Sequence, residues 1–255
     1  MDNIDLIINI INKIKKFIFE IVFPHYCVNC QKEGAPLCDE CLNKIKTRDY
    51  FTCPICNKRM IDLSKCQKCK TKTSLNGLLT ALNSDDAIIH QLIYAYKYNF
   101  VKDLANPLSE ILISYFSKSS IYNGFGKLII EKKLVFMPIP LHKQRLRWRG
   151  FNQSEILAEK LSQRLKTILD TTTLRRAHNT NPQTSTDNRE ERFLNIKNSF
   201  EINNKEKRVN LDNIKGKTII LVDDICTTGA TLEECAKTLK ALKPKHIFGL
   251  VLTRG

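Results

Sequence analysis

The stretch that most constrains the fold of this chain runs from Ile219 to Leu232 and reads IILVDDICTTGATL. A short aliphatic run typical of a strand ends at Asp223 and Asp224. Threonines and a glycine follow, and a helical pattern then extends from Ala230 to Leu242. A strand that passes through a tight loop into a helix is a common unit of α/β folds. The stretch therefore predicts an α/β architecture, with this loop at the carboxyl end of a strand.

The loop in this stretch offers groups that suit a phosphorylated sugar. Backbone N–H groups at the start of a helix lack intrahelical partners, and the helix dipole favours an anion there. Thr227, Thr228 and Thr231 add hydroxyl donors, and Gly229 lets the backbone approach a ligand closely. The two preceding acids can accept hydrogen bonds from sugar hydroxyls or reach a divalent cation. We therefore predict a ribose-phosphate site, with an ordinary acidic strand-to-helix turn as the alternative.

Eight of the ten cysteines form four Cys-x-x-Cys pairs near the start of the chain. The two-residue gap lets both sulfurs of a pair face one ion, and two pairs complete a tetrahedral zinc site. With four sulfur ligands such a site has no open position, so the metal would be structural. We predict two zinc ions, one bound by Cys27, Cys30, Cys38 and Cys41, the other by Cys53, Cys56, Cys66 and Cys69.

Three alternatives to this zinc arrangement stay open. Thiolates alone would also serve an iron–sulfur cluster. Alternate pairs could share an ion in a cross-braced arrangement, or only one of the two sites could be filled. The other two cysteines stand apart from the pairs: Cys235 fits the buried face of a helix, and Cys226 is interpreted as a small loop residue rather than a reactive thiol.

Charge and cysteine usage bear on the partners and the compartment of this chain. The net charge of +15 predicts anionic partners such as nucleic acid, phosphorylated ligands or an anionic membrane face. No secretory signal is recognisable, and metal-bound thiolates fit a reducing environment, so we expect a cytoplasmic protein. No run approaches the roughly 20 apolar residues that a membrane span requires.

Pattern changes along the chain predict three parts, at residues 1–24, 25–73 and 74–255. In the first, apolar residues from Ile4 to Val22 follow helical spacing. They predict an amphipathic helix docked on its own protein, with contact to a membrane surface as the alternative. The second part carries the cysteine pairs. For the third we predict strands at Gly77–Leu82 and Leu134–Ile139, and helices from Asp85–Asp86 to Lys97–Tyr98, at Leu104–Phe116 and at Ser154–Leu165, the last capped by Asn152.

A basic loop is predicted between the strand that ends at Ile139 and the helix that begins at Ser154. Arg145, Arg147 and Arg149 in this loop suit a pyrophosphate or a nucleic-acid backbone, with a solvated basic turn as the alternative. The loop also holds the only tryptophan, Trp148. We expect its ring to pin the loop to its own domain, and the alternative is stacking on a nucleic-acid base.

Three segments of the chain resemble known families. Residues 219–232 resemble the 5-phosphoribosyl-1-pyrophosphate (PRPP) motif of type I phosphoribosyltransferases. Residues 138–153 narrow the resemblance to the ComF family. So does a set of residues that recurs in the family's order over 174–200, namely Arg176, Thr180, Gln183, Arg192, Asn195 and Phe200. The resemblance implies a type I phosphoribosyltransferase fold, with a mainly parallel sheet flanked by helices and a small N-terminal double zinc ribbon.

The resemblance also implies roles for the motif residues. In type I phosphoribosyltransferases the paired acids hold the ribose 2′- and 3′-hydroxyls, the following Thr-Thr-Gly-Ala-Thr cradles the 5′-phosphate, and Mg²⁺ accompanies PRPP. The PRPP-binding residues implied here are Asp223, Asp224, Thr227, Thr228, Gly229, Ala230 and Thr231. Residues 175–195 would form a mobile flap over this ligand, with a disordered linker as the alternative.

Two functions follow from the resemblance. The first is a PRPP-binding competence protein that handles incoming single-stranded DNA, with a competence helicase or other DNA-uptake proteins as partners. The second is a phosphoribosyltransferase, in which a nitrogen acceptor attacks the anomeric carbon of PRPP and Arg145, Arg147 and Arg149 stabilise the departing pyrophosphate. No residue stands out as a reader of the acceptor, and His142 is interpreted as a turn residue rather than a general base.

Overall fold

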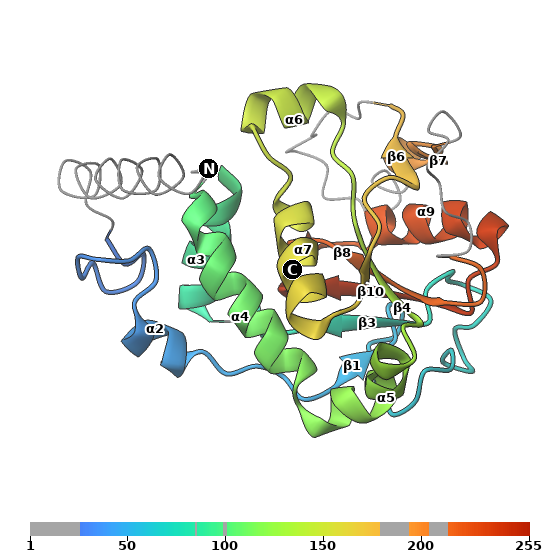
Figure 1. Ribbon diagram of the computed structural model, residues 1–255, viewed down its shortest axis with the longest axis horizontal. Coiled ribbons are helices and arrows are strands. Elements are labelled where there is room, and N and C mark those ends of the chain that lie inside the picture. Colours follow the sequence, from blue (N-terminus) through green and yellow to red (C-terminus); the bar gives the residue numbers. More distant parts are fainter. Residues whose placement is uncertain (1–25, 85, 99–100, 179–193, 204–213) are drawn as a thin grey trace, which may run out of the picture. The chain divides into compact units, whose positions relative to one another are not determined.

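The computed structural model describes residues 26–84, 86–98, 101–178, 194–203 and 214–255 (Figure 1). The chain divides into two compact units, Met1–Ile45 and Lys46–Gly255. The predicted helix over residues 4–22 and most of the predicted flap lie outside the described residues. Within the described part, no helix combines the length and the apolar character that crossing a membrane requires.

The described part of the first unit is a cysteine-bearing turn followed by a short helix. Tyr26 and Glu33 form an antiparallel bridge, and α2 follows at Asp39–Lys44. This helix starts with two acids and ends with a lysine, which complements its dipole. Cys41 is buried on it, so the helix presents a thiol to the turn.

A seven-stranded sheet organises the second unit, in the order β2-β1-β3-β10-β8-β4-β5 (Figure 1). Neighbours from β3 to β5 are parallel, whereas β1 is antiparallel to both β2 and β3. The predicted mainly parallel sheet is therefore confirmed. The strands are β2 (Arg59–Met60), β1 (Phe51–Thr52), β3 (Gly77–Thr80), β10 (His246–Val251), β8 (Thr218–Val222), β4 (Leu134–Pro138) and β5 (Ile168–Leu169).

Helices flank this sheet, and two small strand pairs accompany it. The pairs are β6 (Leu174–Arg176) with β7 (Phe200–Ile202), antiparallel, and β9 (Ile225–Cys226) with β11 (Thr253–Arg254), parallel. The helices are α3 (Ala87–Tyr98), the 3₁₀ turn η1 (Lys102–Leu104), α4 (Ala105–Phe116), α5 (Ser119–Ile130), α6 (Lys143–Arg149), α7 (Gln153–Leu165), α9 (Ala230–Leu239) and the 3₁₀ turn η3 (Lys240–Leu242).

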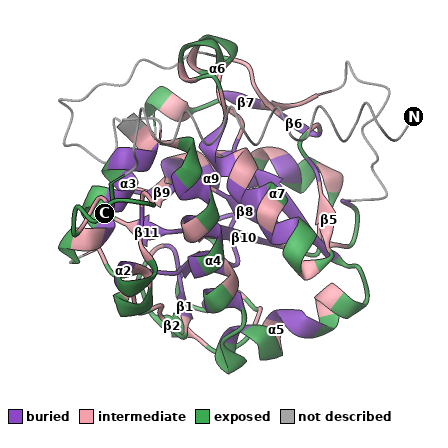
Figure 2. Cartoon of the chain, turned by 60° about the vertical axis from the view of Figure 1, so that its left-hand side comes forward, coloured by how far each residue is buried: buried purple, intermediate pink, exposed green. Residues whose placement is uncertain are grey.

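The central strands are buried on both faces, as Figure 2 shows for β8 and β10. Because side chains alternate along a strand, Ile219 and Leu221 of β8 point to one face, where they share a core with Leu232 and Cys235 of α9. The opposite face carries aromatic rings. Phe248 of β10 packs edge-on against Phe125 of α5, with ring centroids 5.1 Å apart. Because both faces of these strands are buried, their sequences are nearly continuous runs of apolar residues.

Sequence patterns located most of these elements. The predicted strands correspond to β3, β4 and β8, although β3 ends at Thr80 rather than Leu82. Asn152 caps α7 as predicted, its side chain accepting a hydrogen bond from the backbone N–H of Ser154 at 3.2 Å. The helix predicted to run to Leu242 is α-helical only to Leu239 and ends in a 3₁₀ turn.

The predicted basic loop is wrong in one respect, because its central residues form the helix α6. His142 caps this helix by accepting a hydrogen bond from the backbone N–H of Gln144 at 3.4 Å, and Gly150 ends it with φ of 77°. Left-handed backbone of this kind suits glycine. Because both ends are capped, residues 143–149 form a seven-residue helix, although their charge density had indicated only a loop.

Candidate ribose-phosphate site and metal centres

Asp223 and Asp224 follow directly after β8, and neighbouring backbone fixes their position. The N–H of Asp223 donates to the carbonyl of Leu250 at 2.9 Å, and the carbonyl of Asp224 accepts from the N–H of Leu252 at 3.0 Å. The Ser154 hydroxyl, at the start of α7, donates to Oδ1 of Asp223 at 2.9 Å. The acids are therefore held at the carboxyl edge of the sheet, where α/β folds bind ligands.

The two carboxyl groups share a poorly solvated position. Desolvation, and after it the charge of Asp224, raise the pKa of Asp223 to about 7, against the opposing effect of Lys97. The Lys97 ammonium lies 3.8 Å from Oδ1 of Asp224. The raised pKa means that Asp223 holds a proton more tightly than usual. A ligand that donates hydrogen bonds to this carboxyl group, or that carries positive charge, would take the place of that proton. The arrangement thus suits sugar hydroxyls or a divalent cation.

The loop after these acids has the geometry expected of an anion site. Gly229 adopts left-handed backbone with φ of 82° directly before α9. The Thr228 hydroxyl accepts from the N–H of Ala230 at 3.3 Å, and the side chains of Thr227 and Thr231 are at least partly exposed. Cys226 is buried below the loop, which agrees with its interpretation as a small loop residue. The helix start therefore faces outward with hydroxyl groups around it.

The three arginines of α6 do not share one face. Arg145 and Arg149 are one helical turn apart and half-buried, whereas Arg147 lies between them in sequence and is exposed. Arg149 donates to Oε1 of Gln153 at 3.2 Å, and the Nε atom of Arg149 is buried without a hydrogen-bond partner among the described residues. Two arginines, rather than three, are therefore placed to act on one anion.

Trp148, whose ring we expected to pin this segment to its own domain, is 70% exposed on α6. Figure 2 shows that α6 as a whole is an exposed and intermediate element. Capping at both ends of α6 helps to hold the segment.

The structure adds a third arginine that sequence reasoning had given no role. Arg176, on β6, has its guanidinium 5.3 Å from the ring centroid of Phe200. Desolvation lowers the pKa of Arg176 and the charge of Arg145 lowers it further, while Asp223 acts in the opposite direction. Arg176 therefore lies within electrostatic reach of both the acid pair and α6. In the sequence, only its position within residues 174–200, which resemble the ComF family, indicated that Arg176 could be functional.

A pocket of about 360 Å³ lies beside the end of β4. Pro138 in its wall pairs with Val222 of β8, the residue before Asp223, but neither acid lines the pocket. Polar side chains dominate the rest of the wall. They come from α6, α7, β6 and the segment after β7, and include Lys143, Asn152, Glu155, Arg175, Arg176 and Asn203.

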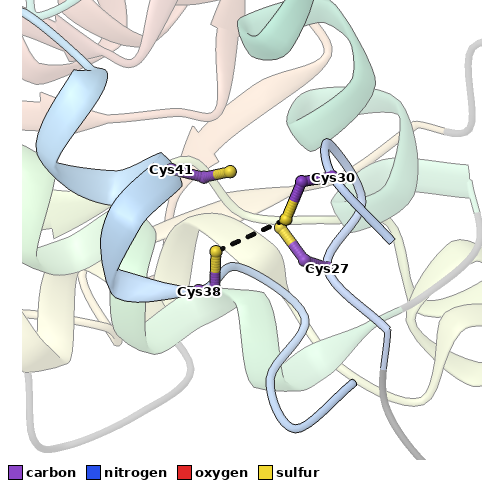
Figure 3. A group of neighbouring side chains, drawn as sticks. All are labelled: Cys27, Cys30, Cys38 and Cys41. Atoms are coloured by element: carbon purple, nitrogen blue, oxygen red, sulfur yellow. Dashed lines mark hydrogen bonds between the residues drawn. The ribbon is translucent and has the colours of Figure 1, made fainter. Parts of the chain in front are cut away.

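The cysteine sulfurs gather into two groups, each made of consecutive pairs rather than alternate ones. In each group the four sulfurs lie within 4.8 Å of one another. A tetrahedral zinc ion with Zn–S bonds of about 2.3 Å needs sulfurs about 3.8 Å apart. The Cys30 and Cys38 sulfurs are 3.6 Å apart (Figure 3), and those of Cys56 and Cys66 are 3.8 Å apart. The donor sets therefore fit two structural zinc ions.

Backbone N–H groups favour the thiolate form of one cysteine in each group. Burial alone would raise the pKa of Cys27, but the N–H groups of Cys30, Cys38 and Asn29 outweigh it and lower the value to about 6. The backbone N–H of Lys58 is the main cause that lowers the pKa of Cys56 to about 7. Thiolate is the form that binds metal, so these N–H groups favour metal binding by Cys27 and Cys56.

Comparison with known proteins agrees with this geometry. The phosphoribosyl transferase domain model matches residues 152–254, which contain the acid pair and the helix start. Competence protein ComFC of Bacillus subtilis is 29% identical over 82% of this chain and 79% of its own length. DNA utilization protein YhgH of Escherichia coli K12 is 28% identical over 86% of this chain and 92% of its own length. The match to competence protein F of Haemophilus influenzae is shorter, at 32% identity over 44% of this chain and 46% of that protein.

The chain is therefore similar in sequence to proteins of the ComF family.

In this chain, the second cysteine group is joined by two routes to residues 225–229 between the acid pair and α9, which we term the phosphate loop after the role predicted for it. Arg254 donates to the carbonyl of Pro54 at 3.0 Å and also to the side chain of Asn57, both within or beside the Cys53–Cys56 pair. Arg254 belongs to β11, which pairs with Ile225 and Cys226 of the loop. One cysteine pair thus contacts the strand that forms the loop's floor.

The second route passes through the start of α9. Glu233 accepts hydrogen bonds from the hydroxyl of Thr73 at 2.6 Å and from the backbone N–H of Ser74 at 2.7 Å. These residues follow Cys69, and the N–H of Lys72 donates to its carbonyl at 2.9 Å. The metal group and the loop are therefore parts of one hydrogen-bonded structure in the second unit.

Proposed function

We propose that this chain binds PRPP together with Mg²⁺ and acts in the cytoplasm in natural competence, where it handles incoming single-stranded DNA. The observation that carries PRPP binding is the acid pair, Asp223 and Asp224, fixed at the end of β8 beside the open start of α9. The acids suit the ribose hydroxyls and the cation, and the loop residues Thr227 to Thr231 suit the 5′-phosphate. Mg²⁺ would supply charge to neutralise the pyrophosphate.

Two observations support the DNA role. The relatives named above are competence proteins and DNA utilization proteins, and the longer matches cover most of this chain. The net charge of +15 also favours an anionic partner. The partners proposed for such a role are DNA-uptake proteins, among them a competence helicase that would deliver the single strand.

Calorimetric titration of PRPP into the zinc-loaded chain with millimolar Mg²⁺ tests the ligand. We expect saturable binding by the natural chain and none by a double variant, Asp223→Ala with Asp224→Ala. Absence of binding by the natural chain would overturn the PRPP assignment. Transformation assays with the same variant then test its biological use, because an unchanged frequency would separate PRPP binding from DNA handling.

Phosphoribosyl transfer is the second candidate, and the pocket beside β4 favours it. A volume of about 360 Å³ at the end of β4, the strand that pairs with β8, leaves room for an acceptor, with Glu155, Arg176 and Asn203 in its wall. In the reaction an acceptor nitrogen forms a bond to the anomeric carbon, the bond to pyrophosphate breaks, and the acceptor loses a proton to solvent or a base. Arg145 and Arg149 would stabilise the leaving pyrophosphate.

A screen of nucleobases and amines tests the transferase, with pyrophosphate release and the ribosylated product as paired readouts. Release that depends on one acceptor class would establish turnover. If PRPP binds but no acceptor yields product across the screen, the binding function stands and the transferase is rejected.

A further inference from the structure

The amino edge of the sheet carries lysines at four neighbouring strands. Register places Leu134 of β4 and His246 of β10 on either side of Thr218 of β8, and β5 pairs with β4. Each of these strands is preceded within three residues by one or two lysines. With Lys127 of α5, they form what we term the amino-edge lysine cluster: Lys127, Lys132, Lys133, Lys166, Lys215, Lys217, Lys243 and Lys245.

Backbone hydrogen bonds hold these lysines together despite their like charges. The carbonyl of Lys133 accepts from the N–H of Thr218 at 2.9 Å, and the carbonyl of Lys217 accepts from the N–H of Lys245 at 2.8 Å. Strands in a sheet are about 4.8 Å apart, so the lysine stems emerge in a closely spaced row. Since the sheet already fixes the backbone, a ligand would have to order only the side chains.

Little negative charge offsets the cluster among the described residues around it. A hollow of about 350 Å³ is lined by Lys127, Lys133, Lys245, Gly216, Leu128 and one acid, Glu131. Glu131 lies 2.9 Å from the Lys133 ammonium and 3.8 Å from that of Lys127. All members of the cluster except Lys217 are exposed, and Lys217 is half-buried. Concentrated, solvent-accessible positive charge attracts polyanions.

We propose that the amino-edge lysine cluster binds the phosphate backbone of single-stranded DNA. Lysine acts as a point charge that contacts phosphates without reading bases, and the lining of the hollow offers no aromatic ring for stacking. Binding at this edge would therefore be independent of sequence and sensitive to salt. A hollow suits a strand of phosphates better than a lipid surface, which favours an exposed apolar face. The proposal rests on the DNA part of the proposed function and locates it.

This location separates DNA from PRPP. The lysines precede the strands and the acid pair follows β8, whose five residues span roughly 17 Å at about 3.3 Å each. The two ligands would then bind at opposite edges of one sheet at the same time. Saturating PRPP should not displace DNA.

A matched pair of variants tests the cluster in the full, zinc-loaded chain. The first is Lys133→Gln, Lys217→Gln and Lys245→Gln. The control is Lys58→Gln, Lys68→Gln and Lys70→Gln, three exposed lysines around the second cysteine group. Both lose the same charge. The probe is a fluorescent oligothymidylate of about 20 nucleotides, followed by anisotropy over a salt series.

We expect the cluster variant to bind roughly 100-fold more weakly near 0.1 M salt. The slope of log K against log salt should flatten by about 2, since each lost contact to a single strand removes about 0.7. The control should keep the natural slope and bind PRPP normally, as should the cluster variant.

Each other result overturns the proposal in a different way. Equal binding by the cluster variant and the natural chain rejects the cluster while leaving DNA handling intact. Loss of binding in the control alone moves the DNA site to the cysteine module. Failure of the natural chain to bind the oligonucleotide rejects the DNA role itself. Binding of the natural chain to anionic vesicles but not to the oligonucleotide would make the cluster a membrane surface.

Discussion

Glu233 accepts a hydrogen bond of 2.6 Å from the hydroxyl of Thr73, although 160 residues separate them in the chain. Glu233 lies in the first turn of α9, immediately after the phosphate loop, and Thr73 follows the last cysteine of the second metal group. The backbone N–H of Ser74 donates to the same carboxylate. This buried carboxylate therefore connects the metal group to the loop that would hold the ribose phosphate.

Glu233→Ala should weaken both ends of this connection. It leaves the Thr73 hydroxyl and the Ser74 N–H buried without their acceptor, which costs about 1–3 kcal/mol of unfolding free energy. Urea denaturation measures that loss, and a chelator titration should release the second zinc ion at a lower chelator concentration. Glu110→Ala, at an exposed position of α4, should change stability by less than about 0.5 kcal/mol. Unchanged zinc retention in the Glu233 variant would contradict the connection.

Asp223 should make stability depend on pH. Its pKa rises from 3.8 to about 7 on folding, mainly by desolvation, so the folded chain binds this proton more tightly than the unfolded chain. Asp223 therefore lowers stability progressively as pH rises from about 4 to about 7, and the loss is complete above that range. Urea denaturation at pH 5 and pH 8 should show this loss for the natural chain relative to Asp223→Asn. A difference between the two proteins that does not change with pH would refute the assignment.

Gly229→Ala should disturb the phosphate loop through backbone strain. The position has φ of 82°, and an added Cβ would lie 3.7 Å from the Cys226 sulfur, so space is sufficient and conformation is the cost. We expect about 1–2 kcal/mol of destabilisation and weaker PRPP binding by calorimetry. Gly216→Ala is the control, since φ is 72° there and no atom lies within 4 Å of an added Cβ. It should cost similar stability and leave PRPP affinity unchanged.

Arg145→Ala and Arg147→Ala should differ in their effect on PRPP. Arg145 is half-buried on the face of α6 shared with Arg149, whereas Arg147 is exposed. A hydrogen bond to a charged group contributes about 1.5–3 kcal/mol, so the Arg145 variant should bind PRPP at least about 10-fold more weakly. The Arg147 variant should stay within about twofold. Equal losses of PRPP affinity in the two variants would indicate that all three arginines contact the ligand.

Removal of either cysteine group should leave one zinc ion on the chain. Cys27→Ser with Cys30→Ser empties the first group, and Cys53→Ser with Cys56→Ser empties the second. Metal analysis should find two zinc ions per natural chain and one per variant. Only the second variant should lower the thermal midpoint of the large unit, because its hairpin pairs with β3. Loss of both ions from either variant would indicate a shared site.

Short-range spacing made part of this protein readable from its sequence. The strand, loop and helix around Asp223 and Gly229 follow from local propensity and from backbone freedom at one glycine, so their order along the chain already specified them. The paired cysteines behaved likewise, since each metal group uses ligands within a few residues of one another. Asn152 at the start of α7 is a third local signal. The loop predicted for the charged residues 143–149 was wrong, because caps at both ends stabilise a helix there despite the charge.

Contacts between distant segments needed the tertiary structure. Ser154 meets Asp223, Arg176 approaches the acid pair, and Glu233 meets Thr73 only after both faces of the sheet are covered. Seven of the amino-edge lysines precede four strands whose register is set by apolar packing, not by the lysines themselves. By itself the sequence determined the ligand groups of the loop and of the metal sites, because those lie close along the chain. Strand order decided which of the remaining charged side chains share an edge of the sheet, because burial of the apolar strands sets that order.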